Sequence, residues 1–145
     1  MLGFGDPPRV LDLVVDEGAD FLVIAGDFDY ADSPVLWELQ TNSWSNVGPD
    51  YPIFGVVGNH DTDAWSGYQD VLQQRFDNNI QPNGGTCTGD IGNRAECKYM
   101  GLEMVFSGTG LMNNDPVDHA QFIEDTLSKD DSIWSLCIWH MNQND

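Results

Sequence analysis

The chain has 145 residues, enough for one domain with a buried core and too few to predict two. Its 24 acidic residues outnumber 5 basic ones, and the formal net charge of -19 excludes nonspecific binding to nucleic acids or anionic membranes. Hydrophobic residues make up 41% of the sequence, which argues against disorder. No apolar run approaches the ~18 residues of a membrane helix, so we expect no membrane span.

The first predicted elements are a helix that begins at Pro7 and a strand over residues 21–25. Apolar residues follow the prolines at helical spacing, and Gly18 ends the helix. The continuous apolar run over residues 21–25 is typical of a strand that is buried on both faces. This strand stops at Gly26-Asp27.

A second helix is predicted from Ser33-Pro34, and a second buried strand over residues 53–57. A strand, helix and strand of this length predict the right-handed parallel crossover of α/β folds. The second strand stops at the run Gly58-Asn59-His60-Asp61. Because the carboxyl ends of parallel strands share one rim of a sheet, we expect these polar side chains to lie beside Asp27.

Further elements follow in the second half of the chain. A helix with an inward apolar stripe is predicted over residues 65–76, and residues 78–97 lack periodicity and predict a long loop. Residues 98–107 predict a strand or a hairpin. A helix is predicted from Asp115-Pro116 with Val117, Phe122, Ile123 and Leu127 facing inward. The last element, residues 133–139, is predicted to be a buried strand that ends at His140.

Two of the cysteines predict a disulfide. Cys87 and Cys97 flank a polar loop, so we favour a disulfide in an oxidising compartment over two free thiols. Cys137 lies in an apolar run and is predicted to be a small buried hydrophobic residue. Residues 1–6 lack the features of a signal peptide, and we nonetheless expect a secreted, extracellular or periplasmic protein from the acidic surface and the disulfide.

The strand-end residues resemble the motifs of the calcineurin-like metallophosphoesterases, a family that includes the purple acid phosphatases. The similar pieces are Gly26-Asp27, Gly58-Asn59-His60-Asp61 and the isolated His140. The resemblance implies an α/β fold, a partial four-layer α/β/β/α sandwich of mostly parallel buried strands with crossover helices. It also implies a dinuclear metal-dependent phosphatase or phosphodiesterase acting on a phosphoester substrate.

The resemblance also implies a role for each residue. Asp27 would bridge two metal ions (iron, zinc or manganese), and Asn59 and His140 would bind the second of them. The metals would lower the pKa of a shared water, whose hydroxide attacks phosphorus. His60 would protonate the leaving oxygen, and Asp61 would orient His60.

Tyr30 has two interpretations. It follows Asp27 by three residues, the spacing at which purple acid phosphatases bind ferric iron through a phenolate. Alternatively, it is a rim tyrosine that packs on Phe28 or Trp37. The remaining polar candidates are predicted to be solvated: Asp29, Asp32 and Asp63 at the rim, and His119 on the surface of its helix.

Two motifs of the family are not found where the family has them: no Asp-x-His or Asp-x-Gly precedes Asp27 at strand spacing, and no Gly-His-x-His follows His140. We therefore expect residues 1–145 to form a single incomplete domain of this kind, truncated at both ends. One alternative is a catalytically incomplete fragment that acts as a metal-binding or structural module. A less favoured alternative is a calcium-binding domain, because Asp27, Asp29 and Glu38 match part of an EF-hand loop. The substrate and the oligomeric state are not indicated.

Overall fold

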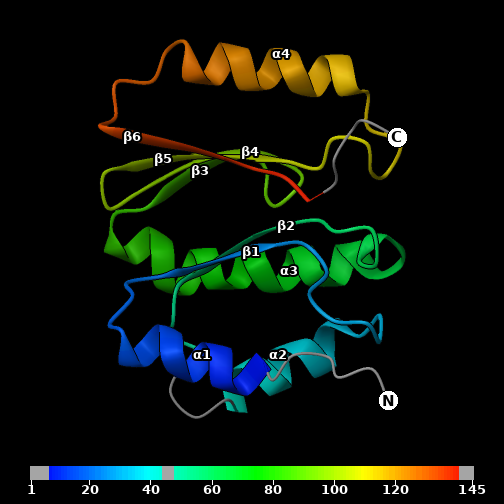
Figure 1. Ribbon diagram of the computed structural model, residues 1–145, viewed down its shortest axis with the longest axis vertical. Coiled ribbons are helices and arrows are strands. Elements are labelled where there is room, and N and C mark those ends of the chain that lie inside the picture. Colours follow the sequence, from blue (N-terminus) through cyan, green and yellow to red (C-terminus); the bar gives the residue numbers. More distant parts are fainter. Residues whose placement is uncertain (1–6, 44–47, 141–145) are drawn as a thin grey trace.

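The computed structural model describes residues 7–43 and 48–140. Two β-sheets lie face to face between helices, with α1 and α2 at one outer side and α4 at the other, so the expected layered α/β fold is confirmed (Figure 1). The helices are α1 (Pro7–Asp16), α2 (Pro34–Ser43), α3 (Trp65–Arg75) and α4 (Pro116–Leu127). The strands are β1 (Leu22–Ala25), β2 (Ile53–Val56), β3 (Thr86–Asp90), β4 (Arg94–Tyr99), β5 (Leu102–Ser107) and β6 (Trp134–Ile138). Residues 1–6, which carry the signal-peptide expectation, lie outside the described residues.

The first sheet consists of β1 and β2, which are parallel as predicted. α2 connects the two strands, and Ala25 pairs with Val56, so both strands end at the same rim. β2 is fully buried, whereas β1 is only half-buried. The expectation that β1 is buried on both faces is therefore wrong, because β1 has one paired neighbour in the described sheet.

The second sheet has the order β3-β4-β5-β6. β5 and β6 are parallel, while β3, β4 and β5 form an antiparallel meander. The prediction of a loop over residues 78–97 is wrong, because β3 and the start of β4 lie within it. β3 is a polar, mostly exposed strand. It is held by pairing and a disulfide, so it lacks the apolar alternation that identifies strands in a sequence.

β6 differs from its prediction in burial. Trp134 is 70% exposed and Leu136 is 45% exposed, so the predicted buried strand is wrong. β6 is the edge strand of its sheet in the described part of the chain, and β5 is its neighbour there. The apolar side chains of an edge strand are covered on one side only, which explains the exposure.

α4 presents a different face to the sheet from the one predicted. Asp115 caps the helix by accepting a hydrogen bond from the Val117 N–H at 2.8 Å, as expected for its start. Val117 is 73% exposed, whereas His119 is 3% exposed and lies 2.8 Å from the Ser107 hydroxyl. The expectations of an inward Val117 and a surface His119 are therefore wrong. The face of α4 that packs inward includes His119 and Thr126. Because both residues are polar, the sequence pattern did not indicate that this face is buried.

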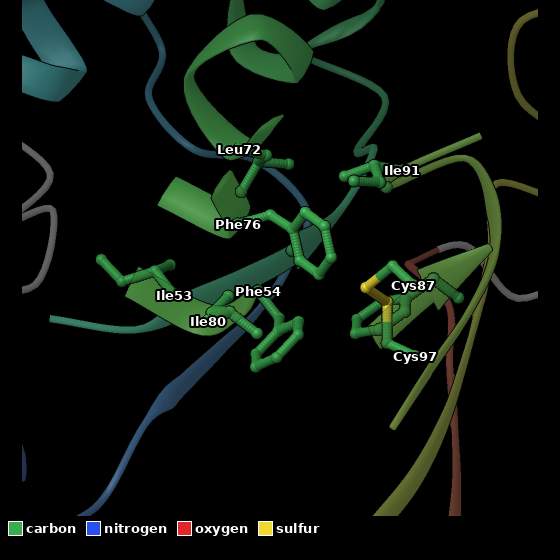
Figure 2. Close-up of a pocket in the computed structure, with 11 residues that line it drawn as sticks. Ile53, Phe54, Leu72, Phe76, Ile80, Cys87, Ile91 and Cys97 are labelled. Carbon is green, nitrogen blue, oxygen red and sulfur yellow. A yellow bond between two sulfur atoms is a disulfide. The ribbon is translucent and has the colours of Figure 1, made fainter. Parts of the chain in front are cut away.

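The predicted disulfide between Cys87 and Cys97 is present and joins paired positions of β3 and β4. It lines an apolar cavity between the two sheets, where Phe54, Phe76 and Ile80 face the sulfur atoms (Figure 2). Cys137 is a half-buried free thiol. No described helix is long and apolar enough to cross a membrane.

Candidate functional site

Two glycines allow the ends of β1 and β2 to approach each other closely. Gly26 has φ +80° and Asp27 has φ 55°, so the chain turns sharply after β1. A Cβ at Gly58 would collide with the Asp27 backbone nitrogen and carboxylate, and a Cβ at Gly26 would lie 2.5 Å from His140 Nδ1. Each glycine therefore makes room for a polar residue of the rim.

The Asp61 carboxylate links the loops that follow β1 and β2 through hydrogen bonds. It is fully buried and accepts hydrogen bonds from the backbone N–H groups of Asp27 (2.9 Å), Phe28 (2.9 Å) and Gly58 (2.7 Å). Burial raises the pKa of the Asp61 carboxyl, and the three N–H donors oppose that shift. These bonds hold Asp27 in its left-handed conformation, which a residue other than glycine rarely adopts without support.

His140 brings the end of β6 to the same rim. Its Nδ1 lies 2.7 Å from the Ala25 carbonyl oxygen, which can only accept, so Nδ1 carries a proton. Its Nε2 lies 2.9 Å from Asn59 Oδ1 and 3.4 Å from Asp27 Oδ1. The side chains of Asn59 and Asp27 thus converge on Nε2, the ring nitrogen that the Ala25 carbonyl leaves available to bind a metal ion.

The donor set is one carboxylate, one amide and one imidazole. No group of three His, Cys, Asp or Glu residues able to hold a metal occurs in the described part of the chain. The cluster of Asp27, Asn59 and His140 falls outside that definition because its third member is an amide. Oxygen and imidazole donors suit divalent metals, and an Nδ1–H bond to a backbone carbonyl is how metal-binding histidines are usually oriented. The residues present therefore fit a metal ion.

His60 and Tyr30 lie beside this cluster on the exposed side. The His60 N–H donates to Asp27 Oδ1 at 3.1 Å, and its ring centroid lies 4.8 Å from that of Tyr30. The Tyr30 hydroxyl lies 3.4 Å from Asp27 Oδ2. The negative charge of Asp27 raises the pKa of the Tyr30 phenol.

Asp29 is not a solvated rim acid, contrary to the prediction. Its Oδ1 accepts hydrogen bonds from the Tyr68 hydroxyl and the Ala31 N–H, both at 2.8 Å. Burial, followed by the hydrogen bond to Asp29, raises the pKa of Tyr68. An EF-hand loop requires a helix before it, and here β1 leads into the loop, so the loop does not have the EF-hand fold on which the calcium-binding alternative was based.

The structure brings together the predicted residues Asp27, Asn59, His60 and His140, and places Tyr30 against them. Asp61 lies beneath them, and its hydrogen bonds go to backbone groups. The sequence reasoning missed two backbone partners, the Ala25 carbonyl and the Phe28 N–H. No side-chain pattern reports such backbone groups, although the glycines at both strand ends indicate a close approach.

A layered α/β domain that collects acid, amide and imidazole groups at its strand ends is typical of metal-dependent hydrolases. The family model for calcineurin-like phosphoesterases matches residues 3–144. The chain therefore belongs to the calcineurin-like phosphoesterase family, whose members are metal-dependent phosphoesterases. No curated protein matches the chain. No solved structure matches it either.

Proposed function

We propose that this domain is a dinuclear metal-dependent phosphoester hydrolase, a phosphatase or phosphodiesterase. The observation that carries the proposal is the convergence of Asp27, Asn59 and His140. The His140 Nε2 atom lies 2.9 Å from Asn59 Oδ1 and 3.4 Å from Asp27 Oδ1. Asp27 would contact both metals through its two oxygens, and Asn59 and His140 would bind one of them. Iron, zinc and manganese all accept this donor set.

The metals supply one part of the chemistry: when bound, they lower the pKa of a water molecule and polarise the phosphoryl oxygens. The chain's own residues do the rest. The water oxygen forms a bond to phosphorus while the bond from phosphorus to the leaving oxygen breaks. His60, exposed beside Asp27, gives its proton to that leaving oxygen.

Asp61 contributes by holding the site together. Its carboxylate ties the backbone of Asp27 to that of Gly58, so the Asp27 oxygens keep their distance from Asn59 and His140. We assign to Asp61 this positioning of the metal-binding loops. The hydrogen bonds of Asp61 run to backbone N–H groups and not to His60, so they do not support the predicted role of Asp61 in orienting the His60 ring.

Tyr30 ligation remains a separate prediction. The hydroxyl lies near Asp27, at a distance from which a small side-chain movement would reach a metal bound by that carboxylate. If the phenolate binds ferric iron, the iron-loaded protein absorbs visible light and Tyr30→Phe is colourless. A colourless, active wild-type protein would exclude this role.

Hydrolysis of p-nitrophenyl phosphate and bis-p-nitrophenyl phosphate tests the proposed function. We expect activity that depends on added manganese, zinc or iron, and losses on the order of 10²-fold or more for Asp27→Asn and His60→Ala. Asp32→Asn, an exposed acid of the same loop, is the matched control and should stay near wild type. Equal activity in all these variants would contradict the proposal.

A second candidate function is a metal-binding or structural module without catalysis. The described residues supply three donor side chains, fewer than two metal ions need between them. If the chain binds metal but hydrolyses neither substrate, the second candidate is favoured. The disulfide favours an exported protein for either function.

A further inference from the structure

The imidazole of His60 needs a partner that fixes its orientation. It is exposed, and only its backbone N–H is anchored, at 3.1 Å from Asp27 Oδ1. No hydrogen bond reaches its ring nitrogens from residues 7–43 or 48–140. A side chain that delivers a proton must nevertheless be held within hydrogen-bond reach of the leaving oxygen.

Asp61 does not supply this orientation. Both oxygens of its buried carboxylate receive backbone N–H groups, from Phe28 at Oδ1 and from Asp27 and Gly58 at Oδ2. The carboxylate is fully buried beneath the loops, whereas the His60 side chain is exposed. In the described part of the chain, the His60 ring is in contact with the ring of Tyr30.

The ring of Tyr30 lies against the His60 imidazole. Their centroids are 4.8 Å apart and the planes are inclined by 59°. Such tilted contacts between aromatic rings are favourable and restrict the rotation of both rings. Tyr30 is 61% exposed, so its ring lies at the surface beside His60 and not in the core.

Tyr30 is itself held in place by its own loop. Its hydroxyl lies 3.4 Å from Asp27 Oδ2. The preceding residue, Asp29, is fixed by the Tyr68 hydroxyl and by the Ala31 N–H, both at 2.8 Å. The backbone on each side of Tyr30 is therefore anchored, and the ring is presented to His60 at a defined angle.

We infer that Tyr30 is the positioning residue for His60, acting through the contact between the two rings. The inference rests on the proposed function, in which His60 protonates the leaving oxygen. The contact involves the ring, so the hydroxyl is dispensable for it. Phenylalanine should replace tyrosine at this position, and an aliphatic residue should not.

The activity test uses the full chain with wild type, Tyr30→Phe and Tyr30→Leu. The substrates are p-nitrophenyl phosphate and phenyl phosphate, because the poorer leaving group depends more on proton donation. We expect Tyr30→Leu to lose about tenfold more in kcat on phenyl phosphate than Tyr30→Phe loses. The loss on p-nitrophenyl phosphate should be smaller. Trp134→Leu, which removes an exposed aromatic ring from β6, is the control and should change neither rate.

A second readout does not depend on activity. In the metal-free protein, the ring current of a neighbouring aromatic side chain shifts the NMR signals of the His60 ring protons upfield. Wild type and Tyr30→Phe should share this shift, and Tyr30→Leu should lose it.

Three results would overturn the inference: equal losses for Tyr30→Phe and Tyr30→Leu, equal losses of Tyr30→Leu on both substrates, or an unchanged His60 shift in Tyr30→Leu. Loss of metal and colour in Tyr30→Phe would instead assign Tyr30 as a ligand. Absence of all hydrolysis in wild type with an intact ring-current shift would contradict the proposed function and leave the ring contact established.

Discussion

The polar rim depends on residues that have no polar side chain. Gly26 and Gly58 let three chain segments meet, because a Cβ at either position would enter the space of Asp27 or His140. The geometry of this candidate metal site therefore depends on the two glycines as much as on the side chains of Asp27, Asn59 and His140.

Gly26→Ala should lower metal affinity by at least about tenfold, because the added Cβ displaces the His140 imidazole. Gly101→Ala is a matched control: both glycines have a positive φ (80° and 82°), but nothing lies within 4 Å of a Cβ at Gly101. Each variant loses about 1 kcal/mol from backbone strain. Metal titration calorimetry separates the two effects, and equal affinities would contradict the collision account.

His119 should make the stability of the fold depend on pH. Burial, and secondarily the charge of Arg94, lowers the pKa of His119 below its ordinary value, while Asp118 and Asp115 partly oppose this shift. The unfolded chain then takes up a proton that the folded chain resists, so stability is full above about pH 6.5 and falls as the pH drops below it. Urea unfolding at about pH 7.5 and about pH 5.5 should show a smaller decrease for His119→Gln than for wild type. Identical decreases would show that His119 does not contribute.

At the scale of elements, the β3–β4 hairpin connects the second sheet to the polar rim. The Val57 N–H donates to the Gly92 carbonyl at 2.8 Å, directly before Gly58. The Gly108 N–H donates to the Asn93 carbonyl at 2.6 Å, which ties the end of β5 to the same turn. The turn therefore supports the loop that carries Asn59 and His60.

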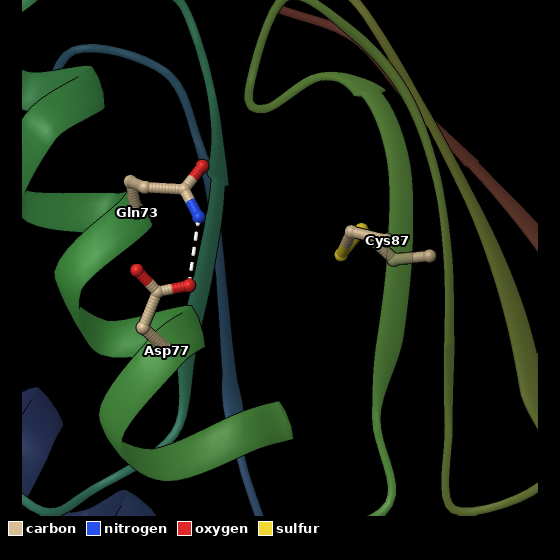
Figure 3. Close-up of a disulfide and its surroundings, with 4 residues drawn as sticks. Gln73, Asp77 and Cys87 are labelled. Atoms are coloured by element: carbon tan, nitrogen blue, oxygen red, sulfur yellow. Dashed lines mark hydrogen bonds between the residues drawn. A yellow bond between two sulfur atoms is a disulfide. The ribbon is translucent and has the colours of Figure 1, made fainter. Parts of the chain in front are cut away.

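Removal of the disulfide should destabilise this hairpin. Cys87 and Cys97 are separated by 10 positions, and opening a loop of that length costs about 2–3 kcal/mol of unfolding free energy. The sulfur atoms face α3 and the helical turn after it, where Gln73 donates to Asp77 at 2.9 Å (Figure 3). Urea unfolding of the Cys87→Ser/Cys97→Ser double variant measures the loss. Cys137→Ser is the control, and an equal loss in that variant would contradict the assignment.

The sequence predicted those elements whose burial follows their pattern. β2 and the apolar stripe of α3 were predictable because continuous or periodic apolar residues reflect full burial. β3 was not predictable, since its residues are polar and its pairing depends on a partner strand and a disulfide. The exposure of Trp134 in β6 was not predictable either, because an apolar run does not report whether a strand lies at the edge of its sheet.

At the scale of the whole molecule, the ends of β1 and β6, which belong to different sheets, bring together residues that are distant in sequence. Asp27 and His140 are 113 positions apart by their numbers, yet their side chains lie 3.4 Å apart. The rule that parallel strand ends share a rim predicted that Asn59 and His60 would lie beside Asp27. The place of His140, which follows a strand of the other sheet, was implied by the resemblance to the family. The rule could not predict that Asp61 would turn inward to bind the backbone, because that depends on N–H groups exposed by the two glycine turns.

The measurement that tests the central claim most directly is the metal content of the purified protein after dialysis, by mass spectrometry, together with metal titration calorimetry. Wild type should retain manganese, zinc or iron. Asp27→Asn and His140→Ala should each lose at least about tenfold in affinity, while Asp63→Asn, an exposed acid nearby, should not. Retention of the same metal with the same affinity in all four proteins would contradict the account.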